Sequence, residues 1–208
     1  MLTAAQLPNP RLKWPIPMEA VALIAEFEGL RLVSYQCIAG VWTCGYGETD
    51  GVGPGMRWTK AYADQRFCDS LTERVNAVRS MLTAYASEHE LAAMTSLAYN
   101  IGLSGLKRSS ALAAHNRGDK LAAARAFGLW NKATINGVLT VLPGLVSRRA
   151  RESALYLTPD EDVQPEPMPQ DVQPESSLAK SPIAASGAVV AIAGAAQVVN
   201  ESTSPVAA

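Results

Sequence analysis

Apolar residues recur every three to four positions along several stretches of the chain, a pattern that predicts helices. The first stretch, MEAVALIAEFE, follows two prolines and stops before Gly29, so a helix is expected over residues 18–28. Thr59 is a candidate cap for a long helix, and Ser87 with Glu90 forms a capping box. The further helices are predicted over about 60–84, 87–102, 109–116, 119–130 and 143–157.

One segment has strand character instead. Residues 32–46 are rich in β-branched and aromatic side chains on both sides of an Ile-Ala-Gly turn, which predicts a small hairpin. The expected fold class is therefore α+β, with one N-terminal hairpin and a mainly helical remainder.

The charge distribution divides the chain near residue 158. Residues 1–158 carry 17 Lys and Arg against 12 Asp and Glu, a net charge of +5, whereas residues 159–208 carry 1 against 7, a net charge of −6. A basic body suits an anionic partner such as cell wall or nucleic acid. We expect four parts: an N-terminal extension over 1–17, a folded domain over 18–158, an acidic linker over 159–180 and an apolar segment over 181–208.

The tail has two kinds of sequence. Residues 159–180 contain the pentapeptide DVQPE twice and are rich in proline, so they cannot bury enough apolar surface to fold. Residues 181–200 carry no charge and approach the roughly 20 residues of a membrane span, but they are rich in Ala and Gly. The tail is expected to be either disordered or associated with a membrane.

The first helix carries a carboxylate on its apolar side. At about 100° per residue, Glu19 and Glu26 share the polar face, whereas Glu28 falls about 180° from Glu19, near Ile24 and Val21. A carboxyl group there loses solvation, which favours its protonated form, as a general acid requires. The alternative is a partly buried Glu that pairs with an arginine for structural reasons, and the helix by itself favours that alternative.

The segment that begins at Glu28, EGLRLVSYQCIAGVWTCGYGET, resembles the active-site segment of the phage-type lysozymes, which include the T-even and lambdoid-like endolysins. In that family a helix ends in Glu-Gly, an Asp follows nine residues after the Glu, and a Thr follows six residues later. The resemblance makes Glu28 the general acid and Thr43 the threonine. AYNIG at 98–102 and LPGLVSRRARE at 142–152 are similar to later segments of the lambdoid-like members. The resemblance covers about 18–157 and implies a lysozyme-like catalytic domain.

Two positions depart from the family pattern. Cys37 stands in the place of the catalytic Asp, although glycoside hydrolysis normally uses two carboxyl groups. One alternative is that a Cys37 thiolate acts as the nucleophile, assisted by Arg31 or a cation of the last helix. A second is that Thr43 positions a water for a single-carboxylate reaction, and a third is that activity has been lost. Glu48 stands where the family usually has His, and with Asp50 it offers a spare carboxylate near the hairpin.

Three further residues are expected to contact the glycan, namely Asn100, Trp130 and Arg148. Amide side chains bond N-acetyl groups, and indole rings stack on sugar rings. The alternative for Asn100 and Trp130, equally expected, is a role as core or cap residues. The resemblance also implies that one arginine of the run at 148–151 approaches Glu28. The other arginines of that run are expected on a solvated basic face.

The predicted activity is that of a lysozyme, which hydrolyses β-1,4 bonds between N-acetylmuramic acid and N-acetylglucosamine in peptidoglycan during host-cell lysis. The expected state is a monomer that needs no cofactor or metal and binds no nucleic acid. His89 and His115 have no metal-ligand partners at suitable spacing and are expected on the surface. The alternatives are a lytic transglycosylase that uses Glu28 alone and a non-catalytic glycan-binding module.

The N-terminus carries prolines and charges where a secretory signal peptide needs an apolar stretch. We therefore expect accumulation in the host cytoplasm and release to the periplasm and cell wall through a lesion made by a holin-like membrane protein. A tether to the inner membrane through residues 181–200 is the alternative route.

Overall fold

A computed structural model of the chain describes residues 6–37, 40–135 and 137–159, and its α+β architecture confirms the predicted fold class. The described residues form seven α-helices, one 3₁₀ turn and two hairpins. In chain order the elements are α1 (Met18–Glu28), β1 (Arg31–Gln36), β2 (Trp42–Gly45), α2 (Lys60–Arg79), α3 (Glu88–Ile101), α4 (Leu103–Lys107), α5 (Ser110–Asn116), α6 (Lys120–Phe127), η1 (Gly128–Trp130), β3 (Lys132–Ile135), β4 (Val138–Val141) and α7 (Pro143–Tyr156).

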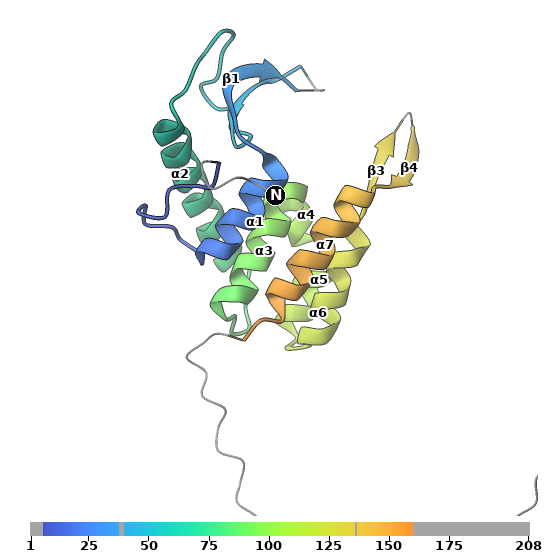
Figure 1. The fold of residues 1–208 in the computed structure, drawn as a ribbon. Helices are drawn as coiled ribbons and strands as arrows, with labels where there is room; N and C mark the ends of the chain where they lie inside the picture. Colours follow the sequence, from blue (N-terminus) through green and yellow to red (C-terminus); the bar gives the residue numbers. More distant parts are fainter. Residues whose placement is uncertain (1–5, 38–39, 136, 160–208) are drawn as a thin grey trace, which may run out of the picture. The chain divides into compact units, whose positions relative to one another are not determined.

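The helix α3 is the centre of the helical body. Every residue of α3 from Glu90 to Ala98 is buried, as expected for a helix that is covered on all sides. It packs against α1, α2, α4 and α7, and Figure 1 shows it between α1 and α7. The predicted capping box at its start is present, because Ser87 Oγ accepts from the Glu90 N–H and Glu90 Oε2 accepts from the Ser87 N–H.

The predicted N-terminal hairpin is confirmed by β1 and β2, which pair antiparallel with Tyr35 opposite Thr43. Two backbone hydrogen bonds close the turn: the Cys37 N–H donates to Val41 O, and the Gly40 N–H donates to Cys37 O. This hairpin directly follows the end of α1, so Glu28 and the hairpin lie in one region of the fold.

The expectation of a single hairpin was wrong. The strands β3 and β4 form a second antiparallel hairpin, with Ile135 opposite Val138. Its sequence signal is the Asn-Gly pair at 136–137 between residues of high strand propensity, which is among the strongest short-range signals for a hairpin. Both hairpins project from the same end of the helical body in Figure 1.

The predicted helix over 60–84 ends earlier, at Arg79. A tertiary contact replaces the last helical turns, because Asn116 Nδ2 donates to Met81 O at 2.9 Å and Asn116 Oδ1 accepts from the Thr83 N–H at 2.9 Å. The five-residue helix α4 was not predicted, whereas the helices near 109–116, 119–130 and 143–157 are confirmed as α5, α6 with η1, and α7.

The predicted linker and apolar tail, at 159–180 and 181–208, lie outside the described residues from position 160 onward. Their boundaries therefore stay predictions. Within the described part of the chain, no helix has both the length and the apolar character needed to cross a membrane.

Candidate active site

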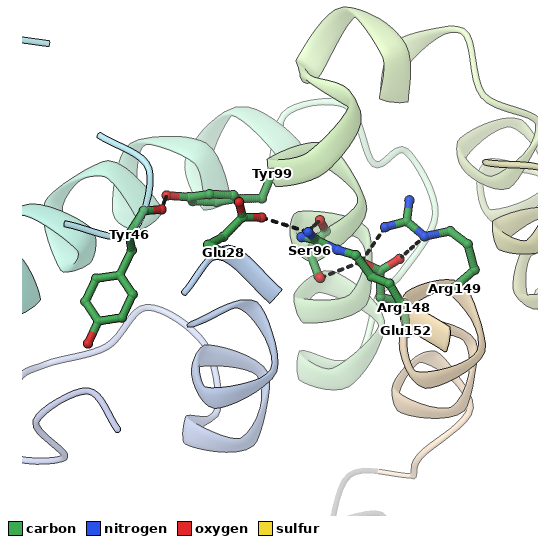
Figure 2. Close-up of polar contacts among 7 residues, drawn as sticks. All are labelled: Glu28, Tyr46, Ser96, Tyr99, Arg148, Arg149 and Glu152. Atoms are coloured by element: carbon green, nitrogen blue, oxygen red, sulfur yellow. Dashed lines mark hydrogen bonds and ion pairs between the residues drawn. The ribbon is translucent and has the colours of Figure 1, made fainter. Parts of the chain in front are cut away.

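Glu28 is the last residue of α1, and 22% of its side chain is exposed. The positive-φ Gly29 ends the helix here, so the carboxyl group stands at the junction with the β1–β2 hairpin. Its Oε1 accepts a hydrogen bond from Arg148 Nη1 at 2.7 Å (Figure 2). Residues 120 positions apart in the chain thus meet in one ion pair.

Two further contacts fix the Arg148 side chain. Its side chain is only 3% exposed, its Nε donates to Glu152 Oε1 at 3.0 Å, and its Nη2 donates to Ser96 O at 3.2 Å. Three groups of one guanidinium are therefore fixed by a carboxylate, a backbone carbonyl and Glu28. A planar guanidinium bound at several points has little freedom to rotate, so it fixes the position of the Glu28 carboxylate.

Glu152 is fully buried and organises this cluster. Its Oε1 also accepts from Ser96 Oγ at 2.6 Å and from Arg149 Nη2 at 3.0 Å, and its Oε2 lies 2.9 Å from Arg149 Nε. Burial raises the pKa of Glu152, whereas the two guanidinium groups and the Ser96 hydroxyl act to lower it. We call Ser96, Arg148, Arg149 and Glu152 the Glu152 network.

One arginine of the last helix, Arg148, approaches Glu28, as the resemblance implied, but the solvated basic face expected for the other two was wrong for Arg149. Arg148 and Arg149 are buried at 3% and 1% exposure, and of the three only Arg151 reaches solvent, where it pairs with Glu26 at 3.0 Å. The missed signal is the placement of Glu152 four and three residues after the two buried arginines, which puts all three side chains on one side of the helix.

Cys37 and Thr43, the two other predicted catalytic residues, both belong to the first hairpin. Thr43 lies on β2 with 5% exposure, and its hydroxyl donates to Val41 O at 3.1 Å. Cys37 follows β1 and is only partly buried, whereas Cys44 and Cys68 are buried. All three are reduced thiols, and burial raises the pKa of Cys44 and of Cys68.

Each cation that was expected to assist Cys37 has a partner of its own. The Arg31 guanidinium lies 4.3 Å from the centroid of the Tyr35 ring. Arg148, Arg149 and Arg151 pair with the carboxylates described above.

The predicted glycan contacts lie on three different elements. Asn100 is exposed near the end of α3, and Trp130 lies in η1, partly buried against the hydrophobic core. Arg148 is buried behind Glu28, which favours a positioning role over the predicted direct contact with the glycan.

The two histidines are not surface residues, contrary to the expectation. His115 is 1% exposed and its Nδ1 lies 2.6 Å from the Tyr156 hydroxyl, and burial lowers its pKa. The side chain of His89 is 13% exposed and its Nε2 lies 2.6 Å from Glu19 Oε1. Both serve packing between helices, because each partner lies on another helix.

The two spare carboxylates differ in burial. Glu48 is 7% exposed, whereas the side chain of Asp50 is fully exposed. Both line a polar pocket of about 430 Å³ between the segment 47–50 and the helix α2, together with Arg66, Asp69, Glu73, Arg74 and Tyr99.

Residues 25–152 match the model of the phage lysozyme family, "Phage lysozyme". The chain is 36% identical to the endolysin of Acyrthosiphon pisum secondary endosymbiont phage 1 over 68% of its own length and 97% of the relative. It is 32% identical to the SAR-endolysin of Pseudomonas phage phiKMV, over 67% of this chain and 87% of that one. Among solved structures it is similar to the muramidase domain of SpmX from Asticaccaulis excentricus, with a TM-score of 0.67 and 35% sequence identity. The match covers 71% of this chain and all of that domain.

The chain therefore belongs to the phage lysozyme family. It is a glycoside hydrolase of the lysozyme class, and its substrate is peptidoglycan, in agreement with the resemblance seen in the sequence.

Proposed function

We propose that Glu28 is the general acid of this lysozyme and that Arg148 is its positioning residue. The observation that carries the proposal is the 2.7 Å contact between Glu28 and an Arg148 side chain that is buried and held at two further points. A carboxyl group at a partly exposed helix end can reach the glycosidic oxygen of the substrate, and its fixed position favours proton transfer in the reaction.

For the second functional group we propose the sulfur of Cys37. The Cys37 thiolate would attack the anomeric carbon while Glu28 gives its proton to the leaving glycosidic oxygen, and water would then cleave the carbon–sulfur bond as the Glu28 carboxylate takes up the water's proton. Cys37 is the one cysteine of the three that is not buried. The alternative is direct attack by a water positioned by Thr43, with Cys37 as a bystander.

Digestion of purified peptidoglycan in H₂¹⁸O tests the reaction and the role of Cys37 together. The wild-type enzyme should place one ¹⁸O at each new reducing end, because water completes the hydrolysis. The Cys37→Ala variant should be at least ~10-fold slower, and wild-type activity should rise with pH as the thiolate forms. Mass spectrometry of the released muropeptides and initial rates of lysis measure both effects.

Cys44→Ser and Cys68→Ser are the matched controls, since both remove a thiol that is buried. Full activity in Cys37→Ala would exclude the sulfur and favour the water mechanism. Unlabelled 1,6-anhydro ends in the wild-type products would instead identify a lytic transglycosylase.

We also propose that Asn100 and Trp130 contact the glycan, and that the enzyme acts as a monomer in host-cell lysis. Two routes to the cell wall remain open for this chain, a holin-like partner protein or a membrane tether through residues 181–200. The SAR-endolysin name of the phiKMV relative supports a membrane-associated route for that protein. Fractionation of expressing cells would separate the two routes, because a tethered enzyme would sediment with inner membranes.

Truncation after Thr158 should leave a folded and active lysozyme domain. The removed segment contains none of the proposed catalytic groups, and its Pro-rich acidic start is not expected to pack on the body. The melting temperature of the truncated chain should stay within about 2 °C of the full chain, which corresponds to less than ~1 kcal/mol. Loss of its thermal transition in differential scanning calorimetry would show that the tail is part of the fold.

A further inference from the structure

A further pocket, of about 560 Å³, lies at the start of α2 and combines aromatic with charged side chains. Trp58 and Tyr62 supply the aromatic rings, and Asp50, Arg57 and Arg66 supply a carboxylate and two guanidinium groups. Of the described residues that line this pocket, none belongs to the Glu152 network and none is a predicted catalytic residue. The proposed catalytic roles therefore do not account for it.

The ring of Tyr62 is exposed beside a second ring that is held in place. The ring centroids of Trp58 and Tyr62 lie 5.0 Å apart at an interplanar angle of 88°, an edge-to-face arrangement. Trp58 is partly buried and its backbone N–H donates to Leu32 O at 2.8 Å, whereas Tyr62 is 48% exposed. Tyr62 thus presents an aromatic surface that a ligand can cover, and the removal of that surface from water favours binding.

The polar groups of the pocket include a hydrogen-bond acceptor and a donor side by side. Arg66 Nη2 donates to Asp50 O at 3.0 Å and lies 3.8 Å from Asp50 Oδ2, and the Arg66 guanidinium carbon lies 5.9 Å from the Trp58 ring centroid. The Asp50 side chain is fully exposed, so its carboxylate can accept hydrogen bonds from a ligand. A guanidinium has five N–H donors, so Arg66 can donate to the same ligand.

The wall formed by residues 56–58 is fixed to the first hairpin. The Ser34 N–H donates to Met56 O at 2.9 Å, the Met56 N–H donates to Ser34 Oγ at 3.0 Å, and Arg57 forms a β-bridge with Val33. Another wall is the first turn of α2, which Thr59 caps. A pocket between two fixed walls loses little conformational entropy when a ligand binds.

This pocket adjoins the polar pocket of about 430 Å³ described above, because Asp50 and Arg66 line both. The lining of the two pockets together runs from Gly47, in the turn after β2, to Tyr62 on α2. A surface of this extent can follow a polymer over more than one unit, and the substrate of this enzyme is a polymer.

We propose that the pocket at Trp58 and Tyr62, which we call the Tyr62 site, is an accessory binding site for sugar rings of the peptidoglycan strand, away from the bond that is cut. A sugar ring has a face of C–H groups that can lie on the Tyr62 ring, and its hydroxyls can both donate to a carboxylate and accept from a guanidinium. A phosphodiester chain fits less well, since the exposed Asp50 carboxylate would repel its phosphates. The inference rests on peptidoglycan as the substrate and not on the proposed roles of Glu28 and Cys37.

The test is an NMR titration of the ¹⁵N-labelled wild-type enzyme with the disaccharide muropeptide, which has no further bond for a lysozyme to cut. The backbone signals of residues 56–62 and the indole N–H of Trp58 should shift and approach saturation. Tyr62→Ala should weaken this binding about tenfold through loss of the ring contact, and Arg66→Gln should weaken it about fivefold through loss of a charged donor.

Kinetics on intact peptidoglycan give a second readout. Both variants should raise KM severalfold with a smaller change in kcat, because the Tyr62 site contacts the strand away from the bond that is cut. Initial rates of turbidity loss over a range of peptidoglycan concentrations separate the two parameters.

Tyr85→Ala is the matched control, since Tyr85 is 77% exposed and lies between α2 and α3, outside both pockets. Its affinity and KM should equal those of the wild type. Absence of shifts at 56–62, or an affinity and KM for folded Tyr62→Ala equal to those of Tyr85→Ala, would overturn the proposal. Tighter binding of a single-stranded oligonucleotide at the same signals would also overturn it.

If Tyr62→Ala does not fold, the wild-type shifts and Arg66→Gln decide the matter. Full activity of Glu28→Gln would refute the proposed acid and leave the titration unaffected, so the two proposals fail separately.

Discussion

Glu28→Gln should lose lytic activity by at least ~100-fold, the usual scale for the removal of a general acid. The amide has nearly the same shape as the carboxyl group and its oxygen can still accept from Arg148 Nη1, but it has no proton to give to the glycosidic oxygen. The measurement is the initial rate of turbidity loss of purified peptidoglycan, together with a thermal melt that confirms folding.

Glu26→Gln is the control for that result. Glu26 lies on the same helix, two residues earlier, and pairs with the solvent-exposed Arg151, so its loss should change activity by less than about twofold. A Glu28→Gln enzyme with more than half of the wild-type rate would remove Glu28 from the mechanism.

Helical periodicity and capping residues predicted most of the fold because these signals are local. The segments around Glu28, Ser87 and Pro143 each carry their own start or stop residues, and the structure has helices there. The end of α2 was missed because it depends on Asn116, a residue from a helix more than thirty positions away. The second hairpin was missed although its Asn-Gly turn is a local signal.

The site shows the same division between local and long-range information. The position of Glu28 on the apolar side of its helix was readable from spacing alone, and the family pattern then gave it a proposed role. The identity of its arginine partner was not readable, because three arginines lie within four residues and only packing of α7 on α3 decides which one meets Glu28. Arg148 faces Ser96 on α3, whereas Arg151 faces solvent.

Arg148→Met should strongly destabilise the fold. The substitution keeps an apolar side chain of similar length but leaves the fully buried Glu152 with one guanidinium fewer, and the unbalanced carboxylate stays in the interior. Breaking a buried ion pair from one side costs about 3 to 5 kcal/mol, so the melting temperature should fall by about 10 °C or more. Differential scanning calorimetry at pH 7 measures the change.

Two further variants distinguish the stability that comes from the buried network from the general effect of removing a positive charge. Arg151→Met removes a cation from the same helix at an exposed pair, so its loss of stability should be below about 1 kcal/mol. Arg148→Lys keeps the charge but cannot contact Glu28, Glu152 and the Ser96 carbonyl with one planar group, so its stability should lie between wild type and Arg148→Met.

Since Glu28 loses its fixed partner in both Arg148 variants, activity measured well below their melting temperatures should also fall about tenfold or more. Equal melting temperatures for Arg148→Met and Arg151→Met would mean that the buried network does not stabilise the fold, and full activity in a folded Arg148→Met would mean that Glu28 needs no positioning by Arg148.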